Sequence, residues 1–116
     1  MNRGIEAMGS GNHSEALEAF DSIVRAAPGF AEGWNKRATL YWLLGEHEAS
    51  VRDIERTLAL EPRHFGALSG LAMIRQEQGQ VFDALDALER IARIHPHMPQ
   101  LDEWMEDLSG GLAEAT

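Results

Sequence analysis

Apolar residues recur along much of the chain at intervals of three and four, which places them on one face of an α-helix. Residues 31–44 are a clear example, because Trp34, Ala38 and Tyr41 follow this spacing, and residues 47–60 repeat it. The pattern predicts seven helices and no strands. Their expected bounds, to within a few residues, are 2–9, 14–26, 31–44, 47–60, 65–78, 81–94 and 99–108.

Helix-breaking residues separate these segments at a constant interval. The prolines that follow each pair of helices are 34 residues apart: Pro28, Pro62 and Pro96. The glycines that lie between the two helices of each pair are also 34 residues apart: Gly11, Gly45 and Gly79. Proline cannot continue a helix, and glycine readily adopts the left-handed conformation that ends one. The chain therefore contains an internal repeat of helix, turn and helix.

Small and large residues also recur in register with the breakers. Small residues that allow close helix packing stand at Gly4, Ala38 and Ala72, and at Ala16, Ser50 and Ala84. Larger residues that fill the space between units are Phe20, Ile54 and Leu88. Thr57 occupies a position that is isoleucine in the other units, so its hydroxyl is expected to bond to a carbonyl one turn earlier. Each helix pair must stack on its neighbours to bury its apolar stripe.

This pattern resembles the tetratricopeptide repeat (TPR), a 34-residue helix–turn–helix unit. The second unit carries it best, at Trp34, Ala38, Tyr41, Gly45, Ser50, Ile54 and Pro62. The third unit carries Leu68, Ala72, Gly79, Ala84, Leu88 and Pro96, with Arg75 in place of the aromatic residue, and the first carries Gly4, Gly11, Ala16, Phe20 and Pro28. The resemblance covers residues 1–98. It implies an all-α, right-handed α-solenoid that acts as a non-enzymatic protein-binding scaffold and needs no cofactor.

The predicted organisation is a single TPR domain over residues 1–116. Its parts are an incomplete first repeat (1–30), a second (31–64), a third (65–98), a capping helix (99–109) and a tail (110–116). The capping helix has an apolar stripe at Leu101, Trp104, Met105 and Leu108, and Gly110 and Gly111 are expected to end it. The position that matches Trp34 in the first repeat falls before Met1. We therefore expect a piece of a longer protein, with a short, frayed first helix as the alternative.

Composition narrows the range of functions. The 116 residues carry a net charge of −9, which disfavours nucleic acid and anionic lipid as partners. There is no cysteine for a disulfide or thiolate, no apolar run long enough to cross a membrane and no visible secretion signal. The compartment stays open. The cytoplasm is the default, whereas a missing signal-bearing N-terminus would allow a periplasmic or exported protein.

The resemblance implies that the first helix of each unit lines a concave groove. The residues between the packed positions are Ile5, Met8, Asn35, Lys36, Thr39, Trp42, Leu43, Ser69, Met73 and Gln76. We expect Trp42 to point outward at the centre, with Lys36 and Arg37 supplying positive charge. The predicted partner is an amphipathic peptide or helix with basic flanks. The alternatives are that these residues belong to the core, or that the chain self-assembles through exposed repeat ends, for example as a homodimer.

Other chemistry has little support in the sequence. The positions at which some TPR proteins hold a chaperone's C-terminal carboxylate correspond to Met1, Ile5, Lys36, Gly66 and Gly70; only Lys36 is basic, so this activity is not expected. The loop histidines His64, His95 and His97 lack the spacing of a zinc site. Asn12, in the sequence Asn-His-Ser, is expected to cap the second helix. No phosphate-binding loop or catalytic motif is present, which argues against an enzyme.

Overall fold

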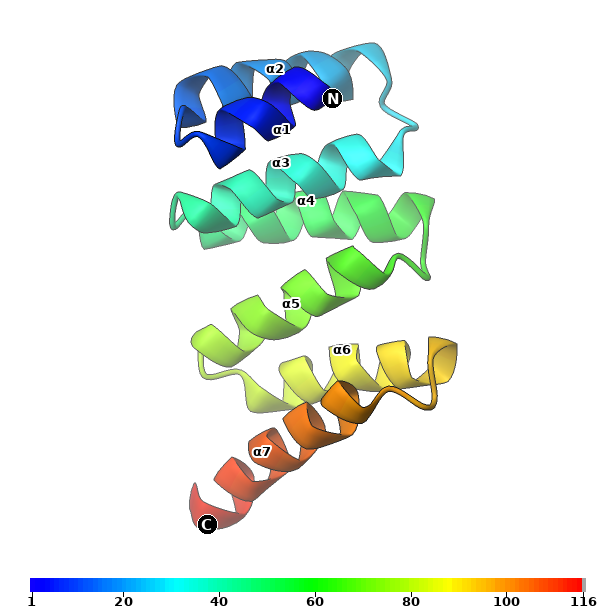
Figure 1. Cartoon of the computed structure of the whole chain (residues 1–116). Helices are drawn as coiled ribbons and strands as arrows, with labels where there is room; N and C mark the ends of the chain where they lie inside the picture. Colours follow the sequence, from blue (N-terminus) through cyan, green and yellow to red (C-terminus); the bar gives the residue numbers. More distant parts are fainter. Residues whose placement is uncertain (116) are drawn as a thin grey trace. The chain divides into compact units, whose positions relative to one another are not determined.

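The computed structural model describes residues 1–115 of the chain, and these residues form seven α-helices and no strand (Figure 1). The helices are α1 (Asn2–Gly9), α2 (His13–Ala26), α3 (Ala31–Leu43), α4 (His47–Leu60), α5 (Phe65–Glu77), α6 (Val81–Ile94) and α7 (Pro99–Ala115). The first six helices begin and end within one residue of the bounds that the sequence predicts.

The end of α7 differs from the prediction. The helix passes through Gly110 and Gly111 and reaches Ala115, so the expected end near residue 108 was wrong. Each glycine in a helix interior costs about 1 kcal/mol relative to alanine, which weakens a helix without forbidding it. No proline follows, and the next residues include the good helix formers Leu112 and Ala113.

Glycines in the left-handed conformation make the turn inside each helix pair, as predicted. Gly11, Gly45 and Gly79 have φ angles of 82°, 77° and 74°. After Gly11, the backbone N–H of Asn12 donates to the carbonyl of Ala7 at 2.8 Å. The backbone N–H groups of Glu46 and Gln80 make the equivalent bond in their own turns. The side chain of Asn12 also accepts from the backbone N–H of Glu15, which confirms its capping role.

The described chain divides into two compact units, which we describe separately: residues 1–67, and the chain from Leu68 onward. In the first unit, α1 packs on α2, α2 on α3, and α3 on α4. Phe20 is fully buried in a cluster with Ala7, Ala16 and Leu40. A Cβ atom on Gly4 would lie only 2.5 Å from the Phe20 ring, so glycine is what lets α1 approach α2 so closely.

The α3–α4 pair is joined by polar groups as well as by apolar packing. The Ser50 hydroxyl donates to the carbonyl of Ala38 at 2.7 Å, which requires the close approach expected from these small residues. Within α4, the Thr57 hydroxyl donates to the carbonyl of Asp53 one turn earlier at 2.8 Å, as predicted. Ala38, Ser50 and Thr57 are all buried. The two hydroxyl groups are therefore hydrogen-bonded, as buried polar groups need to be.

Arg37 lies at the centre of an ionic network, and this corrects its predicted role. Its Nε and Nη2 atoms donate to the two carboxylate oxygens of Asp53 at 2.8 and 2.9 Å, and Nη1 donates to Asp21 at 3.0 Å. Its guanidinium group also lies 5.1 Å from the Trp34 ring and 5.6 Å from the Tyr41 ring. The hydrogen bonds that Arg37 donates to Asp53 raise the pKa of Arg37 above its ordinary value despite partial burial. Arg37 therefore ties α3 to α2 and α4 and does not supply charge to a binding surface.

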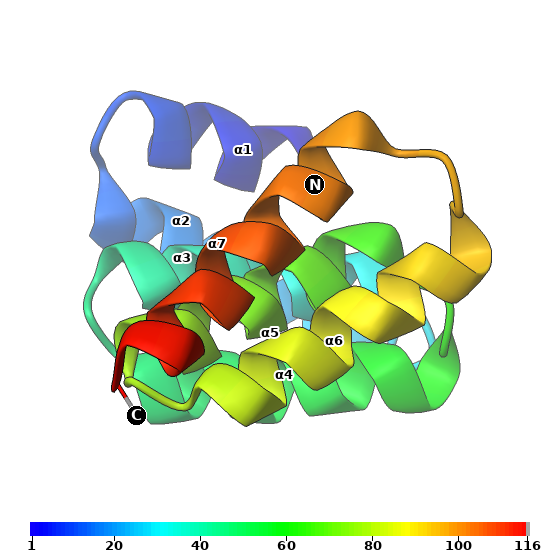
Figure 2. The same cartoon turned by 90° about the horizontal axis from the view of Figure 1, so that it is seen from below.

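The second unit has an apolar interior. On α6, the buried residues are Ala84, Ala87, Leu88 and Ile91. Helix α7 lies beside α6 (Figure 2). Its Leu101 and Leu108 side chains are buried. Trp104 of α7 donates through Nε1 to the Gln76 side chain of α5 at 2.7 Å. The C-terminal helix thus covers apolar surface of the helices before it.

Candidate partner-binding surface

The first unit exposes apolar and polar side chains of α1 and α3 that the sequence assigns to a binding groove. Within residues 1–67, Figure 1 shows α1 in front of α2 and α3 in front of α4. The predicted groove residues that are exposed or half-buried here are Ile5, Met8, Lys36, Thr39, Trp42 and Leu43, which we call the α1–α3 surface. Leu43 is 48% exposed and Ile5 is 39% exposed, whereas Met8 is half-buried against the core cluster.

A polar cluster lies near the N-terminal end of α3. Glu32 accepts a hydrogen bond from Asn35 Nδ2 at 3.2 Å, and its Oε1 atom lies 3.8 Å from Lys36 Nζ. Its other oxygen lies 3.1 Å from His64 Nε2. Partial burial opposes the ionisation of Glu32, but the hydrogen bonds from Asn35 and His64 and the attraction of His64 and Lys36 outweigh it, so the pKa of Glu32 is lowered. This end of α3 is therefore polar, whereas its other end presents Leu43.

Two predicted groove residues of α3 are less accessible than the repeat pattern suggests. Asn35 is buried, with its carboxamide donating to Glu32 and packed close to Gly66. Trp42 is half-buried and interacts with another group of the protein. The neighbouring Leu43 is the more exposed side chain. A partner would therefore meet Leu43 first and only part of the Trp42 ring.

The remaining predicted groove residues belong to α5 beyond Ala67 and hence to the second unit. Met73 is 39% exposed and Ser69 is half-buried. Gln76 is exposed and accepts the hydrogen bond from Trp104 of α7. The side-chain oxygen of Gln76 therefore already accepts a hydrogen bond within its own unit.

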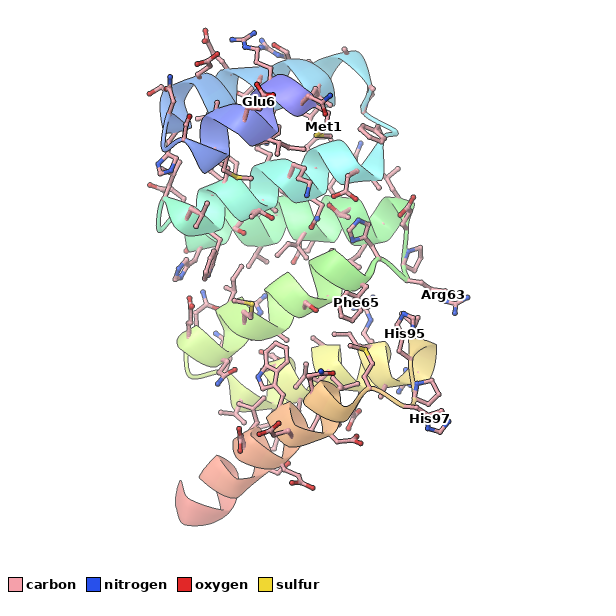
Figure 3. The ribbon with its side chains drawn as sticks, viewed as in Figure 1. Met1, Glu6, Arg63, Phe65, His95 and His97 are labelled. Carbon is pink, nitrogen blue, oxygen red and sulfur yellow. The ribbon has the colours of Figure 1, made fainter. Side chains whose placement is uncertain are left out.

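Sequence reasoning assigned no role to His64 beyond that of a loop histidine. In the structure its Nδ1 atom accepts from the backbone N–H of Ala67 at 3.0 Å, and its ring contacts Glu32. Its position directly before a predicted helix was the available signal, but histidine is not among the residues preferred at helix N-caps. His95 and His97 lie in the loop between α6 and α7, and both are exposed (Figure 3).

Over the described residues, no group of three or more histidine, cysteine, aspartate or glutamate side chains is arranged to hold a metal ion. None of the described helices has both the length and the apolar character needed to cross a bilayer.

Sequence comparison decides the family. Residues 1–55 and 44–99 each match the model of the tetratricopeptide repeat. The chain belongs to the tetratricopeptide repeat family. A TPR repeat-containing protein of Rhizobium etli is 42% identical over 98 residues, which are 84% of this TPR chain and 48% of that protein. Superkiller protein 3 of Saccharomyces cerevisiae is 28% identical over 78% of this chain and 6% of its own length. The TPR chain thus spans about half or less of these two relatives.

Solved TPR structures share the fold over nearly the whole chain. The first TPR domain of Spaghetti (RPAP3), bound to an HSP90 peptide, superposes with a TM-score of 0.88 at 20% identity, covering 97% of this chain and 89% of that one. The Sgt2 TPR domain from Aspergillus fumigatus gives 0.85 at 22% identity, covering 98% and 77%. The predicted family and the all-α solenoid class are confirmed.

Proposed function

We propose that this TPR chain is a non-enzymatic interaction scaffold that binds a peptide or helix of a partner protein along the α1–α3 surface. The observation that carries the proposal is the exposure of Ile5 and Leu43 on the first helices of two consecutive repeats. Exposed apolar surface is a common mark of a protein contact. Thr39, which occupies the same repeat position as Ile5, is a small exposed residue on the same surface.

Structural neighbours support peptide binding as the mode of recognition. The RPAP3 TPR domains were solved with the HSP90 peptide SRMEEVD and the HSP70 peptide SGPTIEEVD. These peptides end in acidic residues, which this chain is poorly equipped to hold. Lys36 is the one basic residue at the positions expected to bind a terminal carboxylate, and Glu32 lies 3.8 Å from it. The net charge of −9 instead favours a ligand with basic flanks around an apolar anchor.

The proposal includes no catalysis, no cofactor and no nucleic-acid partner. A field of net negative charge repels a phosphate backbone. Self-assembly is the competing account, in which a second copy of the chain covers the exposed apolar residues. Mass measured as a function of protein concentration distinguishes the two, because a peptide-binding scaffold is expected to remain monomeric in the range where it binds its ligand.

The test begins with a random peptide library displayed on phage and selected against the whole chain. An enriched peptide is labelled and titrated with wild type, Leu43→Ser and the control Phe82→Ser. Phe82 is 75% exposed on α6, so both substitutions remove a large exposed side chain. We expect Leu43→Ser to weaken binding by about tenfold or more, since anchors at an interface centre are worth upward of 1 kcal/mol. Unchanged affinity with Leu43→Ser, or a loss confined to Phe82→Ser, would reject this surface.

A further inference from the structure

His64 makes the hydrogen bond of a helix N-cap through a titratable ring. It directly precedes α5, and its Nδ1 atom accepts from the backbone N–H of Ala67, the third residue of that helix, at 3.0 Å. This is the bond that serine, aspartate or asparagine side chains usually provide at a helix start. An imidazole nitrogen accepts a hydrogen bond only while it carries no proton.

The other ring nitrogen links the same side chain to α3. Because Nδ1 accepts from Ala67, the proton of the neutral ring must be on Nε2, which donates to Glu32 Oε2 at 3.1 Å. The His64 side chain is only 11% exposed, so water replaces neither partner easily. One neutral ring of fixed tautomer thus joins α3 to the first turn of α5.

A titratable cap is particular to this position in the repeat. The residue 34 positions earlier is Phe30, which precedes α3 and makes no side-chain cap bond. Glu46 before α4 and Gln80 before α6 make none either, whereas Asn12 caps α2 with a group that does not titrate. The His64 cap also lies where α5 passes from the first compact unit to the second, between Ala67 and Leu68.

We propose that His64 is a pH-sensitive cap, whose protonation releases the first turn of α5. A proton on Nδ1 removes the acceptor for the Ala67 N–H and points a donor toward it. It also places a positive charge at a helix N-terminus, where the helix dipole disfavours cations. Histidine is the side chain that ordinarily changes charge between about pH 5 and 8. The inference is independent of the proposed function.

The surrounding charges determine which contact is lost. Glu32 on α3 faces the ring and accepts from Nε2, which carries a proton in both the neutral and the protonated ring, so the Nε2 bond persists after protonation. Lys36 lies 3.8 Å from the other oxygen of Glu32 and then competes with a second cation. Residues 65–67 in the first turn of α5 carry no charge, and Glu61 and Arg63 in the preceding loop are exposed, with Arg63 extending outward in Figure 3. The expected change is therefore confined to the bond between His64 and Ala67.

Amide hydrogen exchange at Ala67, followed by NMR in the whole chain, tests the proposal. After correction for intrinsic exchange, protection is expected to fall about fivefold between about pH 8 and pH 5, the equilibrium change expected for losing one cap. His64→Asn keeps an N-cap acceptor that does not titrate, so its protection should be independent of pH. His97→Asn removes an exposed loop histidine and should behave as wild type.

Two further readouts separate a switch from a merely structural contact. The ring ¹⁵N shifts of His64 at high pH should report the tautomer with the proton on Nε2. Glu32→Gln keeps an acceptor for Nε2, so the loss of Ala67 protection at low pH should persist in this variant. Constant protection of Ala67 in wild type, a proton on Nδ1 at high pH, or an unchanged pH dependence in His64→Asn would overturn the proposal.

Discussion

Arg3 and Arg37 occupy the same position in consecutive repeats, yet the fold uses them differently. The Arg3 side chain is 63% exposed and lies 3.4 Å from Glu15, a surface ion pair. The Arg37 side chain is 18% exposed and binds both oxygens of Asp53. The residue equivalent to Asp53 in the first repeat is Ala19, so Arg3 has no buried acid to bind.

The third repeat handles this position in another way. Leu71 stands in place of Arg37 and Ala87 in place of Asp53, so both positions are apolar in this repeat. The repeat therefore constrains where helices pack and turn, while the chemistry at a given interior position can be ionic or apolar.

Removing α7 should have the largest effect. Deletion of residues 99–116 exposes the apolar surface that Leu101 and Leu108 cover on the preceding helices. Burial of a leucine contributes about 1.5–3 kcal/mol, so these two side chains alone account for about 3–6 kcal/mol. A thermal melt followed by light scattering should show a lower Tm and aggregation. A truncated chain as stable and monomeric as the full one would contradict the role of α7 as a cap.

Asp53→Ala should be the most damaging single substitution of the ionic network. It leaves the partly buried guanidinium of Arg37 with Asp21 as its remaining acid, at an expected cost of about 3 kcal/mol in the free energy of unfolding. Denaturant titration measures this loss. Arg3→Ala is the matched control and should cost less than about 1 kcal/mol, because its ion pairs are exposed. If both substitutions lowered the free energy of unfolding equally, the buried ion pair of the second repeat would be worth no more than the exposed pair of the first.

Ala72→Leu tests the close packing that the repeats share. Ala72 is fully buried, so a larger side chain must displace its neighbours at a cost of about 1–3 kcal/mol. Ala59→Leu adds the same atoms at an exposed position of α4 and should be nearly neutral. If the two variants unfold at the same denaturant concentration, the assignment of small residues to close helix contacts is wrong.

Trp42→Ala addresses the binding surface and should affect stability least. We expect it to weaken binding of the selected peptide by about 2 kcal/mol if the ring is an anchor. A smaller loss of stability should accompany this, because Trp42 is half-buried. Titration and denaturation of the same preparation compare the two effects. A loss of stability with unchanged affinity would assign Trp42 to the fold alone.

Much of the fold was predictable because the responsible residues act locally. The left-handed glycines and the prolines act on their own turn, and the 34-residue spacing aligns Phe20, Ile54 and Leu88, all of which are buried. The passage of α7 through two glycines was missed because their cost is small and depends on the rest of the helix.

The side-chain contacts around the candidate surface were less predictable because they join residues that are distant in sequence. Arg37 binds Asp21 and Asp53, each 16 residues away on a different helix, and no local pattern marks such a pair. His64 and Glu32 are 32 residues apart. Repeat spacing could place side chains on a helix face, but it could not show that Asn35 would be covered or that Leu43 would be more exposed than Trp42.

The most direct test of the proposed function is an NMR titration of the ¹⁵N-labelled chain with the selected peptide. We predict that the largest amide shifts occur at Ile5, Thr39 and Leu43, with little change around Phe82 on α6. Shifts concentrated around Phe82, with the amides of Ile5, Thr39 and Leu43 unmoved at saturation, would contradict binding along the α1–α3 surface.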